Sequence, residues 1–212
     1  MSRPRLLDLF SGAGGAAVGY HRAGFEVVGV DIKPQPHYPF EFRQKDALWV
    51  LEGETMEGFD AIHASPPCQA YSKARKLQGL RHPDLIASVR ELLLAISLPY
   101  VIENVPGAPL RNPVLLCGEM FGLGVRRERL FETNVEMPFQ LHAHSQNQTK
   151  MGRPPRDGEL MHVVGHFSGV ARGAVAMGID WPMTQDELRE AIPPAYTEWI
   201  GTQLLASLKA AA

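Results

Sequence analysis

The sequence has only two cysteines, Cys68 and Cys117, among its 212 residues. Two thiols are too few for a disulfide framework, and no C-x-x-C pair or similar spacing is present, so we expect no metal site. Such low cysteine usage favours a reducing, intracellular compartment, and we expect a cytoplasmic protein.

The sequence also lacks long apolar runs and an excess of charge of either sign. No run reaches 18 apolar residues, and the apolar part of MSRPRLLDLF is too short for a signal peptide, so we expect neither a membrane span nor a secreted chain. The net charge of −2 excludes a uniformly basic nucleic-acid-binding domain, so a site for a polyanion must be a local patch. With 45% hydrophobic residues, the chain has enough apolar material for one folded domain with room for a small lobe.

Short apolar runs alternate with segments of helical periodicity. The predicted strands cover residues 5–10, 25–32, 59–65, 100–105 and 128–135, and the predicted helices cover 14–24 and 84–96. Residues 139–180 have poor periodicity and read as a loop-rich lobe, and a helical pattern broken by Pro193-Pro194 returns over 184–208. This alternation predicts an α/β fold with a mainly parallel sheet. Ligands of such sheets bind at the carboxyl ends of the strands, where Asp31, Cys68 and Glu103 are expected.

A glycine turn follows the first predicted strand. Gly12-x-Gly14-x-x-Ala17 has the spacing of a dinucleotide turn, and Asp31 stands 19 residues after Gly12, where a carboxylate would meet a ribose hydroxyl. The pattern fits NAD or S-adenosylmethionine equally. A plain turn with a surface aspartate is the alternative, which the position between a strand and a helix disfavours. Asp46 could accept from an adenine amino group or, equally well, could cap a helix.

Cys68 lies in the stretch SPPCQAYS. Two prolines and Gln69 are poor core material, so we expect a rigidly held, partly exposed nucleophile there, whereas Cys117 reads as a small apolar core residue. A run of cations follows without an acid through His82, and it would favour the thiolate and suit a polyanionic substrate. A solvated loop is the alternative interpretation of that run: Lys73, Arg75, Lys76 and Arg81.

A carboxylate ends the apolar stretch YVIENV. Desolvation of Glu103 would raise its pKa, which suits either a proton donor near neutral pH or a core acid held by backbone groups. The run Arg126–Arg129 precedes the last predicted strand, and a solvated cationic turn is its simpler interpretation.

Together these segments resemble the DNA cytosine-5 methyltransferases. DLFSGAGG (8–15), SPPCQAYS (65–72), ENV (103–105) and RER (127–129) resemble that family's cofactor, nucleophile, acid and arginine motifs, in the family's order. The tail over 191–205 resembles the family's last motif more loosely. The resemblance implies a Rossmann-like fold for S-adenosylmethionine-dependent methyltransferases, with helices on both faces of the sheet.

The resemblance also implies the role of each residue. Cys68 would attack a flipped cytosine at carbon 6, Glu103 would act as the acid, and Arg127 and Arg129 would hold the base, so that carbon 5 accepts a methyl group. The residues implied for S-adenosylmethionine are Phe10, Ser11, Gly12, Gly14, Asp31, Ile32, Asp46, Ala47 and Pro66. Those implied for DNA are Gln69, Ser72, Lys73, Arg75, Lys76 and Arg81.

The chain departs from the family in three places. Val125 stands where a glutamine is usual, Arg189-Glu190 stand where a Gly-Asn pair is usual, and only a short region remains for target recognition. We therefore expect a catalytic core over 1–135, a small recognition lobe over 136–182 and a helical segment over 183–212 that returns to the core, with a short or degenerate DNA target.

Several alternatives remain. The substrate could be RNA or single-stranded DNA rather than duplex DNA, since the net charge is mild and the lobe small. A silent nucleic-acid-binding relative and an NAD-dependent dehydrogenase are further readings, the first opposed by the retained Cys68 and Glu103. A monomer is favoured, and both protection from a restriction nuclease and epigenetic marking are compatible with the sequence.

Overall fold

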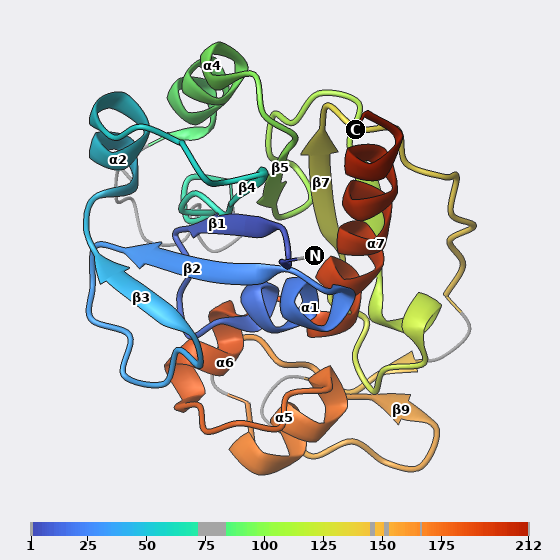
Figure 1. Ribbon diagram of the computed structural model, residues 1–212. Coiled ribbons are helices and arrows are strands. Elements are labelled where there is room, and N and C mark those ends of the chain that lie inside the picture. Colours follow the sequence, from blue (N-terminus) through green and yellow to red (C-terminus); the bar gives the residue numbers. More distant parts are fainter. Residues whose placement is uncertain (1, 72–83, 145–146, 151–152, 166, 212) are drawn as a thin grey trace.

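The computed structural model describes residues 2–71, 84–144, 147–150, 153–165 and 167–211 (Figure 1). Its centre is a seven-stranded sheet with the strand order β3-β2-β1-β4-β5-β7-β6. The strands are β1 (Arg5–Leu9), β2 (Glu26–Asp31), β3 (Glu41–Gln44), β4 (Ala61–Ala64), β5 (Tyr100–Asn104), β6 (Val114–Leu116) and β7 (Arg129–Thr133).

Most of the sheet is parallel. β1 pairs in parallel with β2 and β4, and the ladder continues in parallel from β2 to β3 and from β4 to β5. β7 runs antiparallel to both β5 and β6. The inner strands are buried on both faces, as in Leu6, Leu7 and Leu9 of β1, which is why they read as continuous apolar runs.

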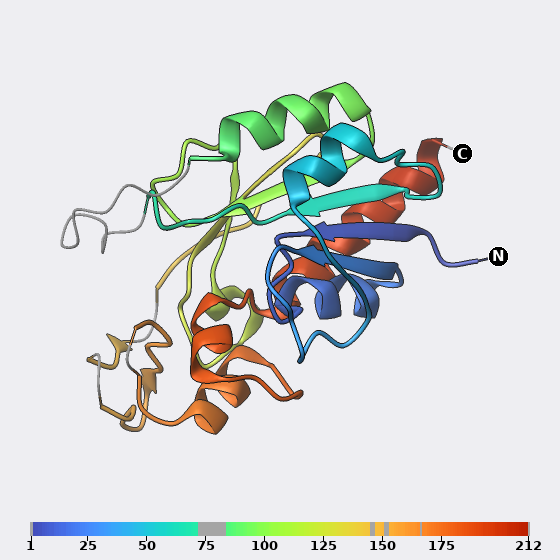
Figure 2. The same ribbon diagram turned by 90° about the vertical axis from the view of Figure 1, so that its left-hand side faces the viewer.

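Helices cover both faces of the sheet (Figure 2). α1 (Gly15–Ala23) and α7 (Pro194–Ala211) pack on one face, and α2 (Ala47–Gly53) and α4 (Ile86–Ile96) pack on the other. The predicted mainly parallel α/β sheet with two covered faces is confirmed. Within the described ranges, no helix combines the length and the apolar character needed to cross a bilayer.

The C-terminal helix packs directly on the first helix. A Cβ added at Gly19 of α1 would lie 2.1 Å from both the Pro194 carbonyl oxygen and the Thr197 hydroxyl, so only glycine permits this approach. Thr197 Oγ1 donates a hydrogen bond of 2.8 Å to the Ala16 carbonyl. The tail therefore ends against the helix that follows the glycine turn, as the sequence predicts.

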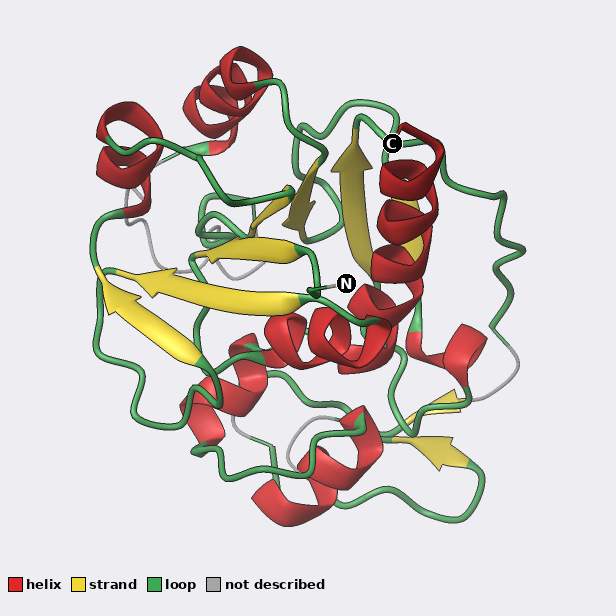
Figure 3. Cartoon of the chain, viewed as in Figure 1, coloured by secondary structure: helices red, strands yellow, loops and turns green. Residues whose placement is uncertain are grey.

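The small lobe is more ordered than the sequence predicts. It contains β8 (Asn147–Gln148), β9 (Glu159–Leu160) and the helix α5 (Val170–Met177), followed by α6 (Gln185–Glu190), around an apolar cluster that includes Met161, Phe167 and Met177 (Figure 3). The sequence predicts a loop-rich lobe, and its poor periodicity did not reveal α5. Gly169 and Gly178, both at positive φ, bound this helix, and glycines at that density obscured its periodicity.

The sequence also missed β3, β6 and α2. β3 is a polar edge strand and β6 has three residues, so neither forms an apolar run of its own. The seven-residue α2 is too short to show a clear period.

Candidate active site

Three segments meet at the carboxyl edge of the sheet, as predicted from the strand ends. In the register of the sheet Leu9 lies opposite Ala64, and Ala64 lies opposite Ile102. The glycine turn after β1, the Pro66–Cys68 loop after β4 and Glu103 near the end of β5 therefore share one edge.

The loop that carries Cys68 is tied to β5. Asn104, which is buried, donates a hydrogen bond of 2.9 Å from Nδ2 to the Pro66 carbonyl. The Tyr71 amide donates 3.0 Å to the Cys68 carbonyl, which closes a turn around the thiol. Cys68 is partly exposed and Gln69 is exposed, as the sequence predicts for this loop.

Glu103 is paired with Arg129. The Arg129 Nε lies 3.0 Å from Glu103 Oε1, and the side chains are 13% and 8% exposed. Burial raises the pKa of Glu103, which agrees with the prediction, while Arg129 and a hydrogen bond from Ser65 oppose that rise. The carboxyl group is thus held in one orientation, with its proton affinity set by two opposing effects.

A buried hydrogen-bond chain leads to Glu103, which the sequence did not reveal. His63 Nδ1 lies 2.9 Å from the Tyr20 hydroxyl, and His63 Nε2 lies 2.8 Å from Ser65 Oγ. Burial lowers the pKa of His63 to about 3, so the ring is neutral. The tautomer with the proton on Nε2 satisfies every member, because Tyr20 then donates to His63, His63 to Ser65, and Ser65 to Glu103.

The pKa of the Cys68 thiol is raised. Burial is the main cause, the Glu103 charge adds to it, and Arg129 opposes it. The described surroundings thus act against the thiolate that the sequence led us to expect. The cations invoked for that expectation, together with Ser72, lie outside the described residues: Lys73, Arg75, Lys76 and Arg81.

Arg127 occupies a different place from Arg129. Its backbone has a φ of +40°, and the side chain is buried. Nε donates 2.8 Å to the Ala191 carbonyl, Nη1 donates 2.8 Å to that of Val163, and Nη2 donates 2.6 Å to that of Arg189. Burial lowers the pKa of this guanidinium to about 9. Arg127 therefore joins its loop to the lobe and to the tail.

Two of the positions at which the chain departs from the family, Val125 and Arg189, lie beside the contacts of Arg127. Arg189 meets Arg127 through its backbone carbonyl, so the contact does not depend on the side chain at that position. Val125 is buried and forms a bridge with Met161 of the lobe. Both departures are therefore accommodated by the packing.

The glycine turn has the shape expected of a small-molecule site. Phe10 and Gly12 have φ values of +57° and +50°, and a Cβ added at Gly12 would meet no atom within 4 Å. The Gly12 amide donates 3.0 Å to Asp31 Oδ2, and the Lys33 amide donates 2.9 Å to Asp31 Oδ1. Open space beside a glycine and a fixed carboxylate suits a ligand that carries a ribose.

Polar atoms without partners lie next to this turn. Asp8 Oδ1 and Ser11 Oγ are buried and make no hydrogen bond within the described chain. Ile32 leaves 64% of its surface exposed beside Asp31. Orphaned polar groups and an exposed apolar side chain together fit a ligand with a charged end and a flat base.

Asp46 caps α2. Its Oδ1 accepts from the Leu48 amide at 2.8 Å and from the Trp49 amide at 3.4 Å, which confirms the helix-cap interpretation. Ala47 and Pro66 are buried near the same edge.

A pocket of about 290 Å³ lies between the arginine loop and the lobe. Its walls come from Val105-Pro106, Arg126–Arg129, Gln148 and Met161–Val164. This hollow adjoins the Glu103–Arg129 pair and is bounded on one side by lobe residues.

The chain is similar to proteins named as Type II methyltransferases. The sequence profile of the family described as C-5 cytosine-specific DNA methylase matches residues 4–112, just over half of the chain. M.HgiGI of Herpetosiphon aurantiacus is 32% identical over 118 residues, which cover 50% of this chain and 94% of that protein. M.AquIA of Picosynechococcus is 31% identical over 125 residues, covering 49% of each chain.

For the first curated relatives the matched share is smaller, at 25%, 49% and 38% of their own length. Among solved structures, S. pombe Dnmt2 methyltransferase superposes with a TM-score of 0.61 at 14% identity, covering 98% of this chain and 99% of that one. Entamoeba histolytica EhMeth gives 0.63 at 14% identity over 98% and 99%. These likenesses show the methyltransferase fold. Because the family profile matches more than half of the sequence, the chain belongs to the C-5 cytosine-specific DNA methylase family.

Proposed function

We propose that this protein transfers the methyl group of S-adenosylmethionine to carbon 5 of cytosine in DNA. The observation that carries the proposal is the buried ion pair between Glu103 of β5 and Arg129 of β7. The residue after Glu103, Asn104, anchors the loop that carries Cys68. Glu103 acts on Cys68 electrostatically, since its charge raises the pKa of the thiol. A nucleophile beside a positioned acid is what attack on a pyrimidine ring requires.

Each residue has a defined part in the reaction. The Cys68 thiolate attacks carbon 6 of the cytosine, forming a sulfur–carbon bond while Glu103 supplies a proton or hydrogen bond at N3. Carbon 5 thereby becomes nucleophilic. S-adenosylmethionine, when bound, supplies an electrophilic methyl group. Once carbon 5 carries the methyl group, loss of its proton to solvent breaks the sulfur–carbon bond. The Cys68 thiolate is released, and the proton at N3 returns to Glu103.

Burial raises the pKa values of both Cys68 and Glu103. For Glu103, a shift of the pKa towards the protonated form suits the acid role. The Cys68 thiol rests protonated, so it must lose its proton as the substrate enters. The positive charge of Arg129 opposes the rise in the pKa of both Cys68 and Glu103. The same charge would stabilise negative charge that develops on the base.

Arg127 has a positioning role in this proposal. Its three nitrogens all donate to backbone carbonyls, which leaves Arg129 as the arginine that holds the base. The sequence resemblance implied the same role for both arginines, and the geometry favours dividing it.

The glycine turn and the strand ends would hold the cofactor. Ser11 and Gly12, with Phe10 and Gly14, would surround its methionine end, and the unpartnered Ser11 hydroxyl offers a polar contact there. Asp31 and the exposed Ile32 would meet the ribose and adenine. Asp46, Ala47 and Pro66 would complete the adenine side.

DNA would bind across the carboxyl edge, with the target base flipped out of the duplex. We assign target recognition to residues 136–182, the catalytic core to 1–135 and a returning segment to 183–212. The pocket of about 290 Å³ between Arg129 and the lobe supports this division. Of the residues predicted to contact DNA, Gln69 lies in the part of the chain that the structure describes.

Bisulfite sequencing of DNA treated with the protein and S-adenosylmethionine tests the activity, the base and its context together. We expect methylcytosine in a short sequence context, and Cys68→Ala should abolish it. Methylation that persists unchanged in the variant would contradict the mechanism. Competition with single-stranded DNA and RNA decides the substrate, because a clear RNA preference would replace duplex DNA in the proposal.

A further inference from the structure

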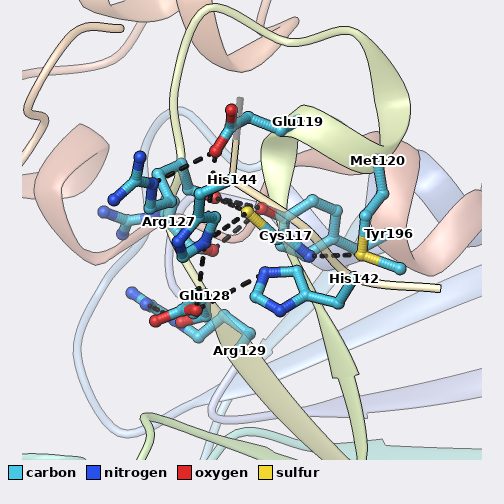
Figure 4. Close-up of polar contacts among 10 residues, drawn as sticks. Cys117, Glu119, Met120, Arg127, Glu128, Arg129, His142, His144 and Tyr196 are labelled. Atoms are coloured by element: carbon cyan, nitrogen blue, oxygen red, sulfur yellow. Dashed lines mark hydrogen bonds and ion pairs between the residues drawn. The ribbon is translucent and has the colours of Figure 1, made fainter. Parts of the chain in front are cut away.

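Four side chains from separate segments converge behind the arginine loop (Figure 4). Cys117 follows β6, Glu128 precedes β7, and His142 and His144 lie in the segment after β7. The ligand atoms of Cys117, His142 and His144 all lie within 4.8 Å of one another. The cluster lies outside the site formed by Cys68 and Glu103.

The spacing of these atoms matches the edges of a metal coordination tetrahedron. The Cys117 Sγ lies 3.8 Å from His144 Nε2, and Glu128 Oε1 lies 3.3 Å from His144 Nε2 and 3.5 Å from His142 Nε2. Zinc bonds of about 2.0–2.3 Å at tetrahedral angles place ligand atoms about 3.3–3.7 Å apart. Three of the separations among these atoms therefore fall near the edges of such a tetrahedron.

A second observation points to a missing partner. The His142 Nε2 atom is buried and makes no hydrogen bond within the described residues. The two imidazole rings stand at 87° with centroids 4.5 Å apart, and their side chains are 26% and 32% exposed, so an ion could reach them from solvent. A metal site without its ion would present such a nitrogen: it is buried beside a carboxylate and a thiol and has no hydrogen-bond partner.

We propose that Cys117, His142, His144 and Glu128 form a structural zinc site. A thiolate, two imidazoles and a carboxylate are zinc's preferred donor types, and four protein ligands leave no open position for chemistry. Glu119 lies farther away, at 4.0 Å from His144, and pairs with Arg126 at 3.1 Å, so it supports the site from outside. Binding of Zn²⁺ releases the Cys117 proton to solvent as the sulfur–metal bond forms.

The site would brace the loop that carries Arg127 and Arg129. The Cys117 thiol donates 3.1 Å to the Arg126 carbonyl, and the Tyr196 hydroxyl donates to the Arg126 and Arg127 carbonyls at 3.3 and 2.8 Å. When the thiol becomes a thiolate, the Gly118 amide, which donates 2.6 Å to the Arg126 carbonyl, keeps that carbonyl partnered. The ion would then cross-link β6, the arginine loop and the segment that leads into the lobe.

No motif in the sequence indicated this site, and we expected no metal and a merely apolar Cys117. The ligands are spread over three segments, and only the antiparallel pairing of β6 with β7 brings Cys117 beside Glu128.

Zinc content of the purified full chain tests the proposal. We expect about one zinc per chain, and Cys117→Ser and His144→Ala should each lose the metal or weaken its affinity more than about tenfold. The matched control is Cys68→Ser, the same change at the other cysteine, which should retain its zinc. His144 is partly exposed, so its variant should still fold if Cys117→Ser does not.

Substitution with Co²⁺ identifies the ligands independently. We expect the strong visible bands of tetrahedral cobalt and a thiolate-to-cobalt charge-transfer band, both present in Cys68→Ser. The charge-transfer band should be absent in Cys117→Ser, whereas His144→Ala should weaken both sets of bands together because it binds less cobalt. A chain without zinc, or with zinc that all variants retain equally, overturns the proposal. A cobalt spectrum without a thiolate band does so as well. None of these readouts depends on methyl transfer.

Discussion

Asn104 Nδ2 donates a 2.9 Å hydrogen bond to the Pro66 carbonyl, and so joins the last residue of β5 to the loop that carries Cys68. Its Oδ1 also accepts from the Val105 amide at 3.0 Å. One buried amide therefore fixes the separation between the proposed nucleophile and the strand that carries the proposed acid.

Asn104→Ala should lower kcat by about ten- to a hundredfold, because a small displacement of a nucleophile is enough for such a loss. The dissociation constant for S-adenosylmethionine should change less than about twofold. Asn134→Ala is the matched control, since Asn134 bonds to Tyr100 and Leu98 at the opposite end of β5. An equal loss of kcat in both variants would show that general stability, and not loop position, is affected.

Alkylation of Cys68 should report the charge of Glu103. The rate of reaction with iodoacetamide should rise with pH, with a midpoint above that of an ordinary thiol, because burial and the Glu103 charge raise the Cys68 pKa. Glu103→Gln removes that charge, so its midpoint should move to lower pH. Peptide mass spectrometry distinguishes Cys68 from Cys117. If the midpoint does not move, the Glu103 charge does not act on the Cys68 thiol, which would contradict this prediction.

A buried ion pair between Arg90 and Glu132 joins α4 to β7. Arg90 donates to both carboxylate oxygens of Glu132, from Nε at 2.6 Å and from Nη2 at 2.7 Å, with side chains 8% and 3% exposed. Glu132→Gln leaves the Arg90 charge buried without its partner and should destabilise the fold by about 3–5 kcal/mol. Urea unfolding measures this. The double variant Arg90→Met with Glu132→Leu should be closer to wild type, and an equally unstable double variant would argue against charge burial as the cause.

Asp8 should make stability depend on pH. Burial raises its pKa to about 8 from 3.8, so the stability that protonated Asp8 supports is complete below about pH 4 and is lost as pH rises through about 8. Asp8→Asn cannot ionise. Its free energy of unfolding should therefore fall less steeply between pH 5 and 8 than that of the wild type. Parallel curves for the two proteins would show that Asp8 ionises normally in the folded state.

Gly12 of the glycine turn and Gly19 of α1 should respond differently to alanine. A Cβ at Gly19 would lie 2.1 Å from the Pro194 carbonyl oxygen, so Gly19→Ala should separate α1 from α7 and lower Tm strongly. Gly12→Ala meets open space and bears only the strain of φ +50°, about 1–2 kcal/mol. It should fold and bind S-adenosylmethionine more weakly, as calorimetry can show. Wild-type affinity in Gly12→Ala would remove the turn from the cofactor site.

The order of elements was predictable because the inner strands are buried on both faces and therefore form apolar runs such as RLLDLF and YVIEN. The carboxyl ends of parallel strands share an edge, so the neighbourhood of Asp31, Cys68 and Glu103 followed from those runs. Local chemistry also indicated the cap at Asp46 and the rise in the pKa of Glu103.

Partners distant in sequence were decided by tertiary structure alone. Nothing in RER separates Arg127 from Arg129, yet the positive φ at Arg127 sends its guanidinium to carbonyls of the lobe and tail while Arg129 meets Glu103. Two other features join segments far apart in sequence. One is the hydrogen bond between Tyr20 and His63, and the other is the cluster of Cys117, His142 and His144. Periodicity reports which face of an element is buried, but a hydrogen bond or a metal ligand depends on which other segment the fold brings within about 3 Å.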